Sequence, residues 1–76
     1  MERVIEVGKV YKHFKGHVYE VIVIATDSED LRKKVIYKNV ETKDIWVRDY
    51  NMFNSLVDKE KYPNIEQVYR FEEVNE

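Results

Sequence analysis

The side chains with the greatest capacity for chemistry are two histidines, His13 and His17, and the neighbours Ser28 and Glu29. Two histidines supply fewer ligands than the three or four that zinc usually needs, and the chain has no cysteine to add to them. Ser28 would need a base in a defined geometry to act as a nucleophile, and no strained glycine turn surrounds it. A short polar run of this kind usually caps its own backbone. The sequence therefore predicts no metal site, no cofactor and no catalytic residue.

A second group of residues combines aromatic rings with positive charge. Trp46 and Arg48 lie on one side of a short apolar segment, and the aliphatic residues beside them, Ile45 and Val47, suit a core. The indole and the guanidinium are therefore expected to face outward or to line a groove, where such side chains often bind partners. The residues expected to form this aromatic and basic surface are Tyr11, His13, Tyr37, Trp46, Arg48 and Arg70.

Each of these assignments has a structural alternative, which stays open. Tyr11 and Tyr37 could be core residues whose hydroxyl groups reach the rim of a small barrel. Trp46 could cover the edge of the sheet while Arg48 pairs with a carboxylate. His13 could be a partly buried ring that is hydrogen-bonded within its loop.

Short strands are needed to position these residues. Residues 8–25 read as a β-hairpin, in which a short strand, a polar turn at 15–17 and a long β-branched strand follow one another. Both faces of the long strand are apolar, which predicts that it bends across two parts of the sheet. The remaining strands are predicted over residues 35–40, 45–48 and 67–74. Asp49 is typical of a cap for a helical or 3-10 turn over 50–55, whose Met52 and Phe53 would plug the open end of the fold.

Five strands and no long helix predict an all-β or mainly β fold, an SH3-like small five-stranded barrel with a short 3-10 turn before the last strand. A five-stranded OB-type barrel is the rival. It usually places a helix between its third and fourth strands, where this chain has a short turn at 41–44. Residues 1–76 are expected to form one domain, because two halves would each be too short to bury a core. Residues 8–74 would form the barrel, and residues 1–7 a lead-in or an edge strand.

Composition and charge restrict the class of protein further. Hydrophobic residues make up 43% of the chain and charged residues 37%, which indicates a globular rather than a disordered protein. The net charge of −2 argues against a protein that coats nucleic acid through bulk positive charge. No apolar run is long enough to span a membrane, and the charged N-terminus does not resemble a signal peptide. We therefore expect a cytoplasmic protein without membrane contact.

Several short blocks of the sequence occur together in a known order. They are Tyr11-x-His13-Phe14-Lys15-Gly16, Trp46-Val47-Arg48 and Arg70-Phe71. In these blocks the chain resembles the small bacterial domain-of-unknown-function family 1653, and the resemblance extends from about Gly8 to Phe71. The family usually has a histidine in the loop at 27–30, and a proline where Asp49 stands here. The resemblance implies a compact β-rich bacterial domain, and it brings no activity with it.

The leading hypothesis is a non-enzymatic binding module whose surface recognises a peptide, a nucleic acid or a nucleotide-like small molecule. One alternative is a small hydrolase-like or modifying enzyme in which His13 works with Glu29. Another is an accessory subunit that packs on a larger enzyme. Steep loss of binding with added salt would indicate nucleic acid, whereas a peptide groove should respond weakly.

Overall fold

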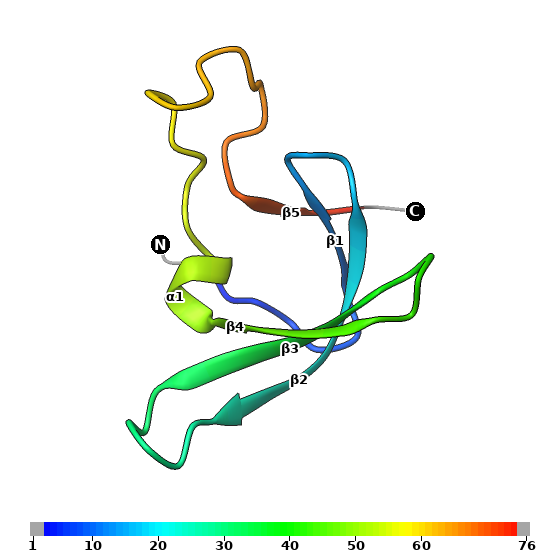
Figure 1. The fold of residues 1–76 in the computed structure, drawn as a ribbon, viewed down its shortest axis with the longest axis vertical. Coiled ribbons are helices and arrows are strands. Elements are labelled where there is room, and N and C mark those ends of the chain that lie inside the picture. Colours follow the sequence, from blue (N-terminus) through cyan, green and yellow to red (C-terminus); the bar gives the residue numbers. More distant parts are fainter. Residues whose placement is uncertain (1–2, 75–76) are drawn as a thin grey trace.

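The computed structural model describes residues 3–74, which form one antiparallel sheet of five strands and one short helix (Figure 1). The strands are β1 (Val10–His13), β2 (Val18–Thr26), β3 (Lys33–Asn39), β4 (Ile45–Asp49) and β5 (Phe71–Glu73), and the helix α1 spans Tyr50–Phe53. The order of the strands across the sheet is β4-β3-β2-β1-β5. The predicted mainly β class is therefore confirmed.

The hairpin of β1 and β2 forms as the sequence predicts. The two strands pair antiparallel, with Tyr11 opposite Tyr19. Gly16 lies in the turn between them with a φ of 106°, a conformation that side chains disfavour and glycine adopts readily. The Gly16 N–H donates to the carbonyl of His13 at 2.8 Å, which closes the turn at the end of β1.

The central strand β2 bends. Its register with β3 shifts between Val21 and Val23, which leaves Ile22 as a bulge. A bulge bends a strand and increases its twist. The sheet consequently curves around the side chains of one face, which is called the inner face below.

The sheet does not close into the predicted SH3-like barrel. Within residues 3–74, β4 and β5 form the two edges and do not pair with each other. The pattern predicts a last strand over 67–74, but regular pairing begins at Phe71, with an isolated bridge at Tyr69. The Glu72 carboxylate instead accepts hydrogen bonds from the N–H groups of Val68 and Tyr69. The prediction of a closed barrel is wrong, because the backbone of residues 68–70 bonds to the Glu72 side chain and to the backbone of Ser55 and Val57, and not to β4.

The helix α1 begins at the predicted cap. The Asp49 carboxylate accepts from the N–H of Asn51 at 3.0 Å, and the turn is α-helical rather than 3-10. Phe53 is fully buried, whereas Met52 is 51% exposed, so only one of the two predicted plug residues enters the core. In the described part of the chain no helix is long and apolar enough to cross a membrane.

Aromatic rings fill the inner face of the curved sheet. The buried cluster consists of Ile5, Tyr11, Val21, Val35, Tyr37, Phe53 and Phe71. Phe53 and Phe71 stack with their ring centres 4.0 Å apart, and the ring of Tyr37 meets them at 5.2 and 5.6 Å. Because each ring buries a large apolar area, a few of them give a short chain a core without a closed barrel.

Residues 3–7 contribute to this core without forming a strand. Ile5 is 2% exposed, and its N–H donates to the hydroxyl of Tyr50 at 2.9 Å. The N–H of Glu6 donates to the hydroxyl of Tyr11 at 3.0 Å. The segment is thus a lead-in rather than an edge strand; residues 1–2 of the predicted lead-in lie outside the described residues.

Candidate functional site

A pocket of about 280 Å³ opens between the β1–β2 turn, β4 and the long segment that precedes β5. Its lining residues are His13, Phe14, Lys15, Arg48, Asp58, Lys61, Tyr62 and Arg70. Three residues of the predicted surface, His13, Arg48 and Arg70, meet here from distant parts of the chain. This volume is near the lower limit for small-molecule sites, roughly 300 Å³. We call it the basic pocket.

Positive charge dominates the basic pocket. The cationic lining residues are Lys15, Arg48, Lys61 and Arg70. Within residues 3–74 none of the four forms an ion pair, since every ion pair found there involves Lys34 at the other end of the sheet. The one lining carboxylate, Asp58, accepts from the N–H groups of Glu60 and Lys61 and so holds a turn. Four cations against one carboxylate leave an excess of positive charge, which favours an anionic ligand.

Both arginines are held through Nε. Arg48 Nε donates to the hydroxyl of Tyr37 at 3.2 Å, and its guanidinium carbon lies 5.6 Å from the centre of the Phe71 ring. Arg70 Nε donates to the hydroxyl of Ser55 at 3.0 Å. In the described residues neither arginine uses its two terminal nitrogens for a hydrogen bond. Each guanidinium therefore keeps the atoms that bind a phosphate or a carboxylate in two-pronged fashion.

His13 separates the basic pocket from the aromatic core. Its ring stacks on Phe14 with centres 4.4 Å apart and meets the edge of Phe71 at 4.9 Å. Its Nδ1 accepts from the N–H of Lys15 at 3.1 Å. Burial, followed by the charge of Arg48 and other nearby cations, lowers the pKa of His13 to about 4. At neutral pH the ring is therefore uncharged, and its Nε2 carries the proton.

Tyr62 forms the opposite wall. Its ring lies 4.8 Å from that of Phe14, and the Nζ atoms of Lys15 and Lys61 lie 5.8 and 5.6 Å from its centre. The surface predicted from the sequence does not include this tyrosine. The available signal was an aromatic residue next to a proline, Pro63, inside a charged segment. A partly exposed ring beside cations can stack on a planar ligand.

The remaining residues of the predicted surface lie outside this pocket. Tyr11 is 2% exposed and Tyr37 is 4% exposed, so both are core residues. Their hydroxyls accept hydrogen bonds from the backbone of Glu6 and from Arg48. Trp46 is 50% exposed on the edge strand and does not line the basic pocket. Burial leaves the two tyrosines no surface with which to contact a ligand.

The two sides of β4 are the reverse of those expected. Ile45 is 59% exposed and Val47 is 64% exposed, so the aliphatic pair does not enter the core. Trp46 pairs with Tyr37, which places Trp46 and Arg48 on the inner face. The interpretation that the aliphatic residues point inward is wrong, because the outer face of this edge strand has no layer packed over it.

The structure separates the two residues that the enzyme alternative requires. His13 lies beside the start of β2, whereas Glu29 lies in the loop after its end, where its N–H donates to Asp27. The whole of β2 lies between them, so the two residues stand at opposite ends of that strand. Among residues 3–74 no group of three or more His, Asp or Glu side chains could hold a metal ion.

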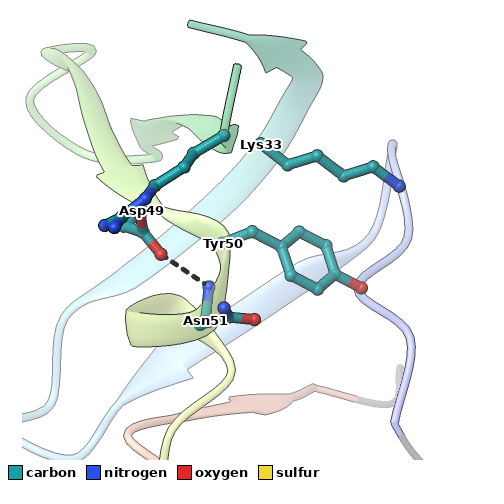
Figure 2. A pocket seen from close by; sticks show the side chains of 5 residues that line it. Lys33, Asp49, Tyr50 and Asn51 are labelled. Carbon is teal, nitrogen blue, oxygen red and sulfur yellow. Dashed lines mark hydrogen bonds between the residues drawn. The ribbon is translucent and has the colours of Figure 1, made fainter. Parts of the chain in front are cut away.

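A second hollow, of about 460 Å³, lies beside α1 (Figure 2). Its lining residues are Arg32, Lys33, Asp49, Tyr50 and Asn51. Figure 2 shows the Asp49 carboxylate bonded to the backbone of Asn51. Asp49 also lies 3.7 Å from Lys34, and the Tyr50 hydroxyl accepts from Ile5. Its anionic and hydroxyl groups are thus engaged in holding the helix and the N-terminal segment.

Comparison with known proteins agrees with the motif resemblance. A family model described as a protein of unknown function (DUF1653) matches residues 9–73, a range that contains all five strands and every residue of the basic pocket. No curated protein and no solved structure matches the chain. With nearly its whole length matched by that model, the chain belongs to the DUF1653 family.

Proposed function

We propose that this protein is a binding module for a small anionic ligand of the nucleotide type, held in the basic pocket. One observation carries the proposal. Arg48 and Arg70 are both anchored through Nε, beside two lysines, and neither forms an ion pair within residues 3–74. Side chains ordered before the ligand arrives lose less entropy on binding, which favours a specific site over a loose positive patch.

The chemistry of the pocket suits a phosphate group attached to a planar ring. The terminal nitrogens of Arg48 and Arg70 can donate to phosphate oxygens in pairs. The Nε2–H of neutral His13 adds a donor without adding charge. The ring of Tyr62 offers a stacking surface, and stacking of a base on an aromatic side chain contributes about 1–3 kcal/mol.

A small ligand fits better than a long nucleic acid. The net charge of −2 argues against binding of an oligonucleotide through bulk positive charge. Four cations converge on the basic pocket, which has the size of a small ligand rather than of a long strand. A cytoplasmic module, as the sequence suggests, would meet free nucleotides at working concentrations.

Calorimetric titration tests the proposal with three probes: AMP, adenosine, and a single-stranded oligonucleotide of about ten residues. We expect AMP to bind and adenosine to bind at least about tenfold more weakly, because the phosphate meets the arginines. We expect the oligonucleotide to bind no more tightly than AMP at about 50 mM salt. Absence of AMP binding at millimolar concentration would overturn the proposal, and a tight, steeply salt-dependent oligonucleotide complex would replace it with nucleic-acid binding.

Variants locate the site. Arg48→Gln and Arg70→Gln should each weaken AMP binding by about tenfold or more, because each removes a two-pronged donor. The matched control is Arg32→Gln, which removes an exposed arginine from the hollow beside α1. Equal loss in all three variants would mean that AMP responds to overall charge and not to the basic pocket.

A further inference from the structure

The edge strand β4 exposes three consecutive apolar residues. Ile45, Trp46 and Val47 are 59%, 50% and 64% exposed, on a strand with a neighbour on one side only. Proteins usually protect such edges with lysine, proline or a bulge. Residues 45–47 contain no charge and no proline, and β4 pairs with β3 without a register shift. The charges of β4, Arg48 and Asp49, lie only at its end, whereas the other edge, β5, carries Glu72 and Glu73 among its three residues.

The pairing of β4 with β3 shows which backbone N–H and C=O groups of β4 do not bond to β3. The N–H of Asn39 donates to the carbonyl of Asp44 at 2.9 Å, in line with the register of the two strands. Bonding alternates along an antiparallel pair, so Trp46 and Arg48 bond to β3. The N–H and C=O groups of Ile45 and Val47 therefore point away from the sheet. No other hydrogen bond in residues 3–74 uses them.

We propose that two copies of this chain pair antiparallel through β4, centred on Trp46, and form one continuous sheet of ten strands from two sheets of five. In this register the outward groups of Ile45 meet those of Val47 in the second copy. Asp44 lies opposite Arg48, so opposite charges meet on each side of the axis. The arrangement is two-fold symmetric and uses the same surface of both copies.

The neighbouring registers fit less well. Centring the pair on Val47 would set Ile45 opposite Asp49, and centring it on Ile45 would set Val47 opposite Lys43. Both changes place an aliphatic side chain against a charge and lose the pairing of Asp44 with Arg48. The chosen register also continues an apolar row on the outer face, in which Val23 pairs with Ile36 and Ile36 with Val47.

Sedimentation velocity over about 10 μM to 1 mM protein tests the dimer, since association depends on concentration. We expect the mass to rise from 9.3 kDa toward twice that value as the concentration rises. Val47→Lys should weaken association at least about tenfold. Val47→Pro should do the same, because it removes an outward N–H and leaves the bonds to β3 in place. A wild-type chain that stays monomeric throughout would overturn the proposal.

The control is Val23→Lys, on the same outer face but on the central strand. This variant should dimerise as the wild type does. If Val23→Lys disrupts the dimer as strongly as Val47→Lys does, the two copies pack through the outer faces of their sheets. The proposal that they pair through β4 would then be wrong. Circular dichroism establishes which variants are folded; should Val47→Pro unfold, Val47→Lys and Ile45→Lys decide, since both positions are exposed. The substituted residues Val23, Ile45 and Val47 do not line the basic pocket, but Arg48 belongs to both surfaces. Arg70→Gln, which lies outside β4, therefore tests the AMP site in the wild type and in the monomeric Val47→Lys background alike.

Discussion

Both ends of the sheet carry clustered charges, but the two ends use them differently. At the end with the β2–β3 loop, one lysine, Lys34, lies within 3.7–3.9 Å of three carboxylates, those of Asp27, Asp30 and Asp49. At the end with the β1–β2 turn, four cations surround a pocket whose single carboxylate is already bonded to backbone. Charges that are neutralised within the fold hold loops and caps. Charges that the fold leaves without a partner are available to a ligand.

The layers beneath the two ends also differ. The basic pocket rests on the aromatic core, since Arg48 and His13 both contact Phe71. The loop at the other end presents Leu31 to solvent at 76% exposure. The proposed ligand site therefore rests on the buried aromatic cluster, which favours side chains that are ordered in advance.

The largest difference in stability between the two ends is expected when the aromatic ring beneath the basic pocket is removed. Phe71→Ala should lower the free energy of unfolding by about 3–5 kcal/mol, because it leaves a cavity beneath the basic pocket. The matched substitution at the other end of the sheet, Leu31→Ala, should change the free energy of unfolding by no more than about 0.5 kcal/mol. Urea unfolding followed by fluorescence measures both variants. Similar losses would contradict the assignment of the core to the pocket end.

A smaller loss of stability is expected when the pH is lowered, because His13 is then protonated in the unfolded chain. Its pKa is lowered to about 4 in the fold, while an unfolded histidine takes up a proton near pH 6.5. The neutral ring of His13 therefore contributes its full stabilisation of the folded state above about pH 6.5. This stabilisation is lost as the pH falls toward about 4, because only the unfolded chain binds the proton in that window. We expect a loss of about 2 kcal/mol, which is less than full linkage because the ring is partly exposed.

Carboxylates titrate in part of the same window, so the measurement is a difference. The free energy of unfolding of the wild type is compared with that of His13→Gln at several pH values between about 4 and 7. This range begins at the pKa of about 4 that His13 has in the fold. The variant should lack the pH-dependent part that the histidine contributes. Parallel curves for the two proteins would show that the ring at the pocket wall is not held neutral.

The smallest effect on stability is expected at the end with the β2–β3 loop, where Lys34 neutralises the carboxylates. Asp49→Ala removes the cap on α1 and the contact with Lys34, and it should cost about 1 kcal/mol. Asp49→Asn keeps an oxygen for the N–H of Asn51 and removes only the ion pair, so it should cost less than about 0.5 kcal/mol. Thermal unfolding compares the two variants. Equal losses would mean that the ion pair, and not the cap, holds this end.

Local patterns predicted the elements of this fold well. The hairpin turn at Gly16 and the cap at Asp49 both form, because each depends on neighbouring residues only. Closure of the sheet failed as a prediction, since it depends on which segment residues 67–70 meet, and they bond to the Glu72 side chain and to the backbone of residues 55–57 instead of β4. Alternation alone does not distinguish these outcomes, because both leave the order of side chains unchanged.

Sequence reasoning named some of the residues that line the candidate pocket and missed others, for a similar reason. His13, Arg48 and Arg70 are residue types that bind ligands, and they do share a pocket. The tyrosines were assigned to the same surface by their chemistry, yet the fold buries Tyr11 and Tyr37 and brings Tyr62 into the pocket instead.

The amino-acid sequence by itself determined the first four strands, the turns and the family, because these follow from short-range backbone preferences and from motifs in order. Only the tertiary structure decided which side of β4 is covered, that the sheet stays open, and which cations remain without a partner. Those outcomes depend on contacts between segments far apart in the chain. Burial and charge compensation are properties of the packed molecule, and no single stretch of sequence contains them.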